Sequence, residues 1–236
     1  MDPIFRWGYE NDYIADISFL GKFKPFKNNT RREKLEDKYL EPDELQKLLF
    51  GFKSKKWELL TRFLSLSGVR IGEAIALNAQ DIDFAEHVIH IDKTIFPALK
   101  SIDAPKTLSS NRDVYMQPEL EKTCRDILLF TKQESVLKGY RTKLFICNTH
   151  GDYVSYVVYN NVLKRTAERV LGFDVTPHVL RHTHASLLLA NGMTLDAISR
   201  RLGHDDSIIT KQIYLHVTHK LKEQEEEQLK NIHIVG

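Results

Sequence analysis

Proline and glycine divide this chain into short segments with helical character. Pro42, Pro118 and Pro177 stand near the start of three such segments, and Gly68 and Gly203 end two others. Proline is tolerated in the first turn of a helix, whereas glycine readily adopts the left-handed conformation that ends one. A mainly α-helical fold is therefore predicted. The chain has 236 residues, 42% of them hydrophobic, which is enough for one sizeable core.

Apolar periodicity places the expected elements along the chain. Alternating residues between positions 87 and 95 predict a half-buried strand, residues 112–116 predict another, and the apolar segment 144–147 is strand-like. These strands form a small sheet beside the helices. The helices are expected at residues 41–52, 56–67, 71–77, 118–138, 156–171, 177–190, 194–202, 207–216 and 219–231.

The first 30 residues are rich in aromatic side chains but show no sustained helical period, so they are interpreted as an appendage or linker. The basic residues that follow have two interpretations. They could track a phosphate backbone, or they could be neutralised by Glu33, Glu36 and Asp37 in a solvated connector. The basic residues are Lys22, Lys24, Lys27, Arg31, Arg32, Lys34 and Lys38.

Composition excludes several classes of protein. The formal net charge is only +2, so any anionic partner has to be argued from local charge. No apolar run approaches the roughly 18 residues of a membrane helix, and the start lacks the pattern of a signal peptide. We therefore expect a cytoplasmic protein. Cys124 and Cys147 are the only cysteines and are expected to be small core residues.

Four polar residues between positions 176 and 214 suit a phosphodiester substrate. His178 and Arg181 are three residues apart and would share one face of a helix. Arginine offers a planar fork to phosphate oxygens, and histidine can donate or shuttle a proton. His204 follows a helix-ending glycine, and Tyr214 supplies a hydroxyl that can act as a nucleophile.

Residue by residue, the chain resembles the tyrosine recombinases, the phage integrase family that includes the Cre and Xer recombinases. The stretch from His178 to Arg181, with the His-Thr that follows, matches the family's His-x-x-Arg box. Leu202-Gly-His204 and Tyr214-Leu-His match its second half. Ser67-Gly-Val-Arg70 resembles the box of the first catalytic arginine, and Ala104-Pro-Lys106-Thr resembles the β-hairpin that presents the catalytic lysine. The resemblance covers about residues 40–218.

The resemblance implies the tyrosine-recombinase fold, mainly α with a small antiparallel β-sheet (α+β). It implies DNA strand exchange through a 3′-phosphotyrosyl intermediate, without metal, ATP or another cofactor. The partners would be a specific double-stranded DNA site and further copies of the chain, as a tetramer on DNA, at the bacterial nucleoid. A weaker inference from their spacing is that Glu73 orients Arg70. The catalytic residues would be Arg70, Lys106, His178, Arg181, His204 and the nucleophile Tyr214.

Three regions are expected. Residues 1–40 would be a linker or the remnant of an N-terminal DNA-binding region, and residues 41–218 the catalytic domain. Residues 219–236 would be a C-terminal helix and tail, exchanged between protomers or packed on their own domain. Family members place a DNA-clamping domain of roughly a hundred residues before the catalytic domain, too large for the residues that precede it here. The chain is therefore interpreted as a catalytic fragment or a natural minimal form.

Each assignment has an alternative. Taken singly, Arg70, Lys106 and Tyr214 would be a helix-end arginine, a solvated lysine and a core tyrosine. His178, His182 and His184 could suggest zinc, although arginine and lysine partners suit an anion better. Residues 194–216 superficially resemble a helix-turn-helix of a non-catalytic DNA-binding protein. A type IB topoisomerase-like enzyme would share the chemistry without strand exchange.

Local charge favours DNA. Between Arg141 and Arg201 there are eight Lys or Arg residues against four acids, a local charge of +4.

Overall fold

The computed structural model describes residues 2–16, 39–96, 101–103 and 111–203. The chain divides into two compact units, residues 1–35 and 36–236. In the first unit, Asp2–Glu10 form a helix, α1, where the sequence analysis expected none. Trp7 stacks on Tyr13 with ring centroids 5.6 Å apart, so aromatic packing holds this short helix against the turn that follows it. The basic residues at positions 22–38 lie outside the described residues.

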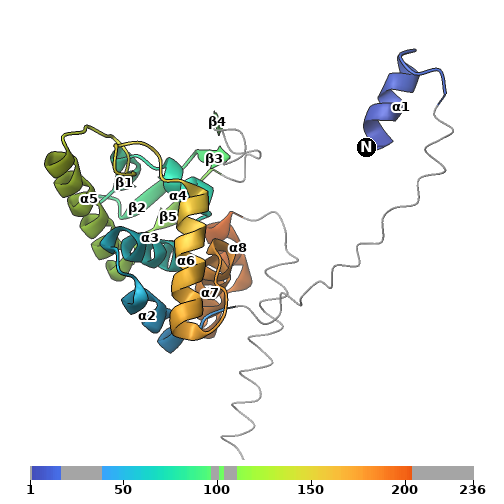
Figure 1. Cartoon of the computed structure of the whole chain (residues 1–236). Coiled ribbons are helices and arrows are strands. Elements are labelled where there is room, and N and C mark those ends of the chain that lie inside the picture. Colours follow the sequence, from blue (N-terminus) through green and yellow to red (C-terminus); the bar gives the residue numbers. More distant parts are fainter. Residues whose placement is uncertain (1, 17–38, 97–100, 104–110, 204–236) are drawn as a thin grey trace, which may run out of the picture. The chain divides into compact units, whose positions relative to one another are not determined.

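The second unit is mainly helical, as predicted (Figure 1). The local signals act as expected: Glu41 and Glu44 form a capping box around Pro42, and Gly68 ends α3 in the left-handed conformation with φ 68°. The predicted helices 207–216 and 219–231 lie outside the described residues. The helices are α2 (Pro42–Gly51), α3 (Lys55–Ser67), α4 (Ile71–Ala76), η3 (Ala79–Asp81), α5 (Pro118–Lys138), α6 (Tyr156–Leu171), α7 (Pro177–Ala190) and α8 (Leu195–Leu202).

Between α4 and α5, the described residues form five short strands. β1 (Ile82–Asp83), β2 (Val88–Ile91) and β5 (Arg112–Tyr115) form an antiparallel sheet in the order β1-β2-β5. β3 (Thr94–Phe96) and β4 (Ser101–Asp103) form a separate antiparallel pair. The predicted strand at 87–95 is thus two strands, because the chain leaves the first sheet after Ile91.

The strand-like prediction for residues 144–147 was wrong. Only one bridge, between Asn78 and Leu144, pairs this segment with another part of the described chain. All four residues are buried, so the apolar run reflects burial in the core and not a ladder of hydrogen bonds.

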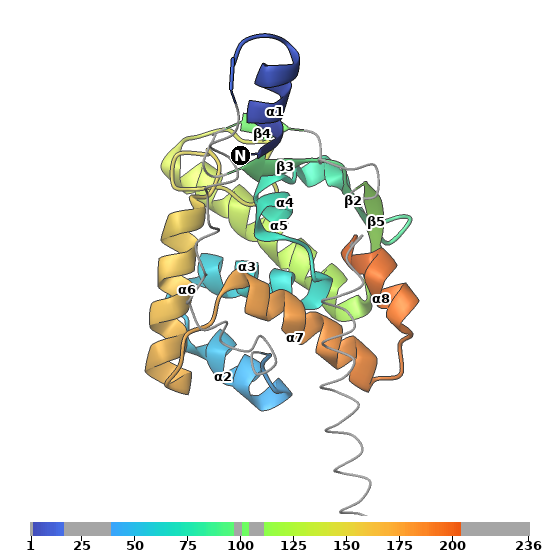
Figure 2. The same cartoon turned by 90° about the vertical axis from the view of Figure 1, so that its right-hand side faces the viewer.

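Helix α3 is the centre of the hydrophobic core. It packs against α5 and α7, with further contacts to α2 and α6 (Figures 1 and 2). The rings of Phe63 and Phe145 lie 5.0 Å apart, and the Thr61 and Tyr159 hydroxyls are 3.0 Å apart in the buried interior. The end of α3 leads through Gly68 directly into α4, so this core fixes the starting point of α4.

Helices α7 and α8 share a small second cluster made by Ala185, Ile198 and Leu202. α8 also packs against β5, which places its C-terminus beside the sheet. The turn between the two helices contains Gly192 at φ 84°. No helix in the described part of the chain is long and apolar enough to span a membrane.

The central position of Phe63 gives a stability prediction. Phe63 is 0% exposed, and Phe63→Ala should lower the free energy of unfolding by about 3–5 kcal/mol because it leaves a cavity in the α3 core. Phe50 is 79% exposed, so the matched Phe50→Ala should change it by no more than about 0.5 kcal/mol. Urea denaturation measures both, and equal costs would contradict a core centred on α3.

Candidate active site

Arg70 lies at the turn between α3 and α4. It is the N-cap residue of α4, and Glu73 closes a capping box by accepting a hydrogen bond from the Arg70 backbone N–H at 2.8 Å. The Arg70 side chain also donates from Nη1 to Glu73 Oε1 at 3.0 Å. The contact that their i, i+3 spacing indicated is therefore present, and the role of Glu73 in orienting Arg70 stays a prediction. Both contacts tie Arg70 to the first turn of α4. Because α4 begins directly after the end of α3, the end of α3 determines where Arg70 lies.

Glu73 is a buried carboxylate, only 3% exposed. Arg112, the first residue of β5, donates to both of its oxygens at 3.1 and 2.8 Å. Burial alone would raise the pKa of Glu73. The hydrogen bonds and charge of Arg112, the Arg70 backbone N–H and the charge of Arg181 outweigh burial, so the pKa of Glu73 is lowered and the carboxylate stays ionised.

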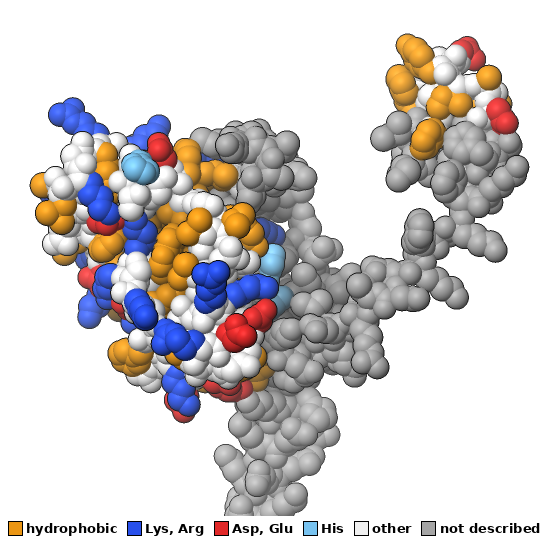
Figure 3. All heavy atoms as spheres, in the orientation of Figure 1, with side chains coloured by type: hydrophobic (Ala, Val, Ile, Leu, Met, Phe, Trp, Pro, Cys, Tyr) orange, Lys and Arg blue, Asp and Glu red, His pale blue; other side chains and the backbone are white. Residues whose placement is uncertain are grey.

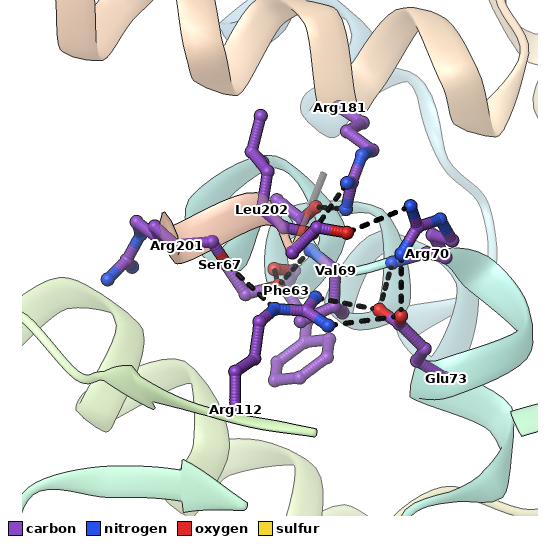
Figure 4. A network of polar contacts seen from close by, with 11 residues as sticks. Phe63, Ser67, Val69, Arg70, Glu73, Arg112, Arg181, Arg201 and Leu202 are labelled. Carbon is purple, nitrogen blue, oxygen red and sulfur yellow. Dashed lines mark hydrogen bonds and ion pairs between the residues drawn. The ribbon is translucent and has the colours of Figure 1, made fainter. Parts of the chain in front are cut away.

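The C-terminus of α8 meets three arginines from three different elements (Figure 4). Arg112 Nε donates to the carbonyl of Arg201 at 2.8 Å. Arg181 Nη2 donates to the carbonyl of Leu202 at 2.6 Å, and Arg70 Nη2 to that of Gly203 at 3.2 Å. The last carbonyls of a helix lack intrahelical partners and carry partial negative charge, so cations are favourable there.

Arg181 projects from α7 into the interior and is only 5% exposed. Nη1 donates to the Gly68 carbonyl at 2.6 Å, so this one side chain joins α7 to both the α3–α4 turn and the end of α8. Burial lowers the pKa of Arg181 to about 9, with Arg70 adding to the effect and Glu73 opposing it. The guanidinium therefore stays charged at neutral pH. Two of its five N–H donors are used by these bonds.

His178 lies in the first turn of α7 and is exposed. Thr176 caps this turn by accepting a hydrogen bond from the Val179 N–H, and Pro177 occupies the first helical position. Partial burial, followed by the positive charges of Arg181 and Arg70, lowers the pKa of His178. A neutral imidazole at neutral pH is able to accept a proton.

Three of the six predicted catalytic residues, Lys106, His204 and Tyr214, lie outside the described residues. Two described residues lie near them in the sequence. Gly203 directly precedes His204, and Arg112 begins the strand that follows the segment containing Lys106. The structure brings Arg70 and Arg181 together at the end of α8, with His178 on the same helix as Arg181.

Arg201, for which no motif in the sequence indicates a role, lies in a second network. Arg201 Nε donates to His184 Nε2 at 3.0 Å, and its other nitrogens reach the Tyr115 and Leu66 carbonyls and Gln117. His184 Nδ1 bonds the Ser65 carbonyl at 2.8 Å. Both ring nitrogens of His184 are thus in use, as expected for a structural histidine. Among the described residues, no group of three or more His, Cys, Asp or Glu side chains could hold a metal ion.

The local charge of +4 overstates the basic surface. Arg181 and Arg201 belong to that count, yet both use their guanidinium groups inside the domain. Arg165 and Arg200 are exposed, and Lys164 and Arg169 also lie on α6. Figure 3 shows Lys and Arg side chains spread among apolar ones on the face that carries α6.

Comparison with known proteins identifies the class. The model of the phage integrase family matches residues 38–220 of the chain. The chain therefore belongs to this family, the tyrosine recombinases that its motifs resemble, and its mainly helical domain with a small antiparallel sheet has their fold.

The similar proteins include integrases of a prophage and a transposon. A probable integrase of prophage ps2 from Lactococcus lactis subsp. lactis is 34% identical over 89% of this chain and 61% of its own length. The Tn1549 transposon integrase, solved with transposon right end DNA, superposes with a TM-score of 0.70 and is 24% identical, covering 96% of this chain and 75% of that one. XerA recombinase gives a TM-score of 0.61 at 24% identity, covering 79% and 65%.

Burial of His184 makes the free energy of unfolding depend on pH. Burial first, and then the charge of Arg201, lowers the pKa of His184 to about 3, whereas an unfolded chain protonates histidine near 6.5. The contribution of neutral His184 to the free energy of unfolding is fully present above pH 6.5 and is lost as the pH falls toward 3. We expect this residue to contribute a slope of up to about 1.4 kcal/mol per pH unit to the free energy of unfolding.

Urea denaturation of the parent and His184→Gln between pH 7 and 4.5 measures this slope. Glutamine retains one donor and one acceptor for Ser65 and Arg201 but does not titrate. The slope should therefore be smaller in the variant, and identical slopes would contradict a buried neutral His184.

Proposed function

We propose that this protein is a site-specific DNA recombinase that cleaves and rejoins DNA strands through a 3′-phosphotyrosyl intermediate. The observation that carries the proposal is the meeting of Arg70 and Arg181 at the end of α8, with His178 exposed on the same helix as Arg181. Two guanidinium groups and a proton acceptor suit a phosphodiester that gains charge in its transition state. Membership of the phage integrase family supports it. The chain spans 61% of the length of the Lactococcus relative, so the activity of the whole relative enters here only as a proposal.

In the first step, the Tyr214 hydroxyl attacks the scissile phosphorus and loses its proton to His178. The bond from phosphorus to the 5′-oxygen breaks, and Lys106 protonates the leaving oxygen. Arg70, Arg181 and His204 bind the non-bridging oxygens. In the second step, the 5′-hydroxyl of a partner strand attacks the phosphotyrosyl link and gives its proton to Lys106. The bond from phosphorus to the Tyr214 oxygen breaks, His178 returns the proton to that oxygen, and the DNA strand is rejoined. The phosphodiester energy is conserved in the link, so the reaction uses neither nucleotide nor metal.

The proposed partners are a specific double-stranded DNA site and other copies of the chain, assembled as a tetramer on DNA at the bacterial nucleoid. The solved Tn1549 relative contains DNA, which supports the DNA partner. Exposed basic side chains such as Arg165 and Arg200 would contact phosphates. The catalytic domain would comprise residues 41–218, with residues 1–40 as linker and residues 219–236 as an exchanged tail.

Two alternatives are distinguished by experiment. A helix-turn-helix protein at residues 194–216 needs no Arg70 or His178, and membership of the family does not favour it. It would bind DNA without becoming covalently attached. A type IB topoisomerase-like enzyme would become attached to one duplex but would not exchange strands between two.

Tyr214→Phe tests the nucleophile. The variant should form no denaturation-resistant adduct with a nicked suicide duplex made from the DNA flanking the gene, since the attacking oxygen is absent. Its DNA binding in gel shifts should stay close to that of the parent. The assay contains EDTA and no nucleotide, so an adduct with the parent also tests independence from metal and ATP.

Tyr156→Phe is the matched control and should keep forming the adduct. Tyr159 is fully buried and its hydroxyl contacts Thr61, so it is not a competing nucleophile in this fold. An adduct that persists in Tyr214→Phe would overturn the assignment.

Arg181→Lys tests the phosphate clamp. Lysine keeps the charge but cannot join the Gly68 and Leu202 carbonyls and also present a planar fork to phosphate. Single-turnover cleavage should fall by about 10²-fold or more. Circular dichroism reports whether the domain stays folded, and cleavage within about threefold of the parent rate would show that Arg181 does not bind the phosphate.

A further inference from the structure

Arg112 has no role in the proposed chemistry, yet its side chain is only 6% exposed. Burying a guanidinium is costly unless its donors are paired. Here three of its nitrogens are paired: Nη1 and Nη2 with the two oxygens of Glu73, and Nε with the carbonyl of Arg201. The fork of Arg112 thus matches the carboxylate in a bidentate arrangement, as Figure 4 shows.

The partners of Arg112 both lie next to proposed catalytic residues. Glu73 holds Arg70 through the guanidinium and the backbone N–H. The Arg201 carbonyl belongs to the last turn of α8, whose next carbonyls bind Arg181 and Arg70. Arg112 therefore contacts the carboxylate that holds Arg70 and, through its Nε, the last turn of α8.

We propose that Arg112 is a positioning residue that holds Glu73, and through it Arg70, in the geometry that binds the scissile phosphate. This inference rests on the proposed function. Arg112 touches no reacting atom itself. Its second contact is with the carbonyl of Arg201 in the last turn of α8, and the next two carbonyls bind Arg181 and Arg70. One side chain therefore acts at both points that hold Arg70.

Electrostatics support the same role. The charged groups that face Glu73 are Arg70 at the start of α4, Arg112 from β5 and Arg181 from α7. Arg112 is the largest of the influences that keep the Glu73 carboxylate ionised against its burial. A protonated Glu73 would offer Arg70 a weaker acceptor, so loss of Arg112 should act on Arg70 through the charge of Glu73.

Gly203 gives an independent geometric constraint. Its φ is 64°, and a Cβ atom there would lie 2.9 Å from Arg112 Nη1 and 3.0 Å from Arg112 Cδ. Any side chain at position 203 would push Arg112 away from Glu73. The close approach of α8 to Arg112 thus depends on glycine at this position.

The first experiment compares parent, Arg112→Met and Arg112→Lys in single-turnover cleavage of the nicked suicide duplex across pH. The cleavage rate of Arg112→Met should fall by about 10²-fold, the effect of misplacing a catalytic group by about 1 Å. DNA affinity in gel shifts should change little. The acid limb of the pH–rate profile should move to higher pH, because the pKa of the buried Glu73 carboxyl rises when its cationic partner is removed.

Arg112→Lys keeps the charge without the bidentate fork. Its acid limb should therefore lie closer to that of the parent, while its rate is still reduced. A merely structural role for Arg112 would lower the amount of active protein without moving the pH profile, and that result would overturn the proposal.

A double-mutant cycle with Glu73→Gln tests whether Arg112 acts through Glu73. In the Glu73→Gln background, Arg112→Met should cause a much smaller further loss of rate and no shift of the acid limb. The double variant removes both charges of the Arg112–Glu73 pair, so neither member is left buried without the other, and it provides the comparison if Arg112→Met alone unfolds at the assay temperature. Equal losses in both backgrounds would overturn the proposal.

Gly203→Ala tests the geometry without changing charge. Gly172, at φ 82°, has the same left-handed conformation, but a Cβ atom added there would have no neighbouring atom within 4 Å. Gly172→Ala is therefore the matched control for backbone strain. Cleavage should fall in Gly203→Ala and stay at the parent rate in Gly172→Ala. Equal rates in the two variants would overturn the steric argument.

The outcomes separate this inference from the proposed function. If the parent forms the covalent adduct and Arg112→Met has the parent's rate and pH profile, the proposed function stands and the role of Arg112 is overturned. If the parent forms no adduct, both are overturned.

Discussion

The rest of the site depends on the pairing of the buried Glu73 carboxylate with Arg70 and Arg112. An ionised group in the interior is tolerated only when its neighbours supply charge and hydrogen bonds. Here they come from the start of α4 and from β5, which are distant in the sequence. The carboxylate therefore requires that helix and sheet meet at one place, and any packing that separated them would leave a charge without partners.

The end of α8 meets the complementary requirement. Its free carbonyls need donors, and buried arginines need acceptors. Arg112, Arg181 and Arg70 satisfy both needs at once through consecutive carbonyls. The arginines are held in place before any phosphate arrives, which lowers the reorganisation that the proposed reaction would require.

Much of the fold could be predicted from the sequence because its signals are local. The expected bounds of α5 and α6 match the structure, since their apolar periodicity and flanking residues lie within each segment. The segment 144–147 was misassigned because an apolar run is equally compatible with a strand and with irregular chain in the core. Helix α1 was missed because it is only nine residues long and stands in an aromatic-rich stretch without a sustained helical period, and because the stacking of Trp7 on Tyr13 is a contact that no local pattern encodes.

The site was predictable only in part. The motif spacing singled out Arg70, His178 and Arg181, and the i, i+3 relation of Arg70 and Glu73 pointed to their contact. The roles of Arg112 and Arg201 depend on long-range contacts with Glu73 and His184, which no local pattern encodes. A count of basic residues likewise could not separate guanidinium groups at the surface from those used inside the domain.

The hydrogen bonds between the three arginines and the carbonyls at the end of α8 also affect which substitutions this site tolerates. The three acceptors are main-chain oxygens, so they do not depend on which side chains occupy positions 201 and 202. A substitution there leaves the acceptor atoms chemically unchanged, and it acts on them only through the backbone that the contacts of Arg201 with His184 and of Leu202 with Ala185 and Ile198 hold in place. Glycine at position 203 is the exception, because a side chain there would strain the left-handed backbone and would lie too close to Arg112.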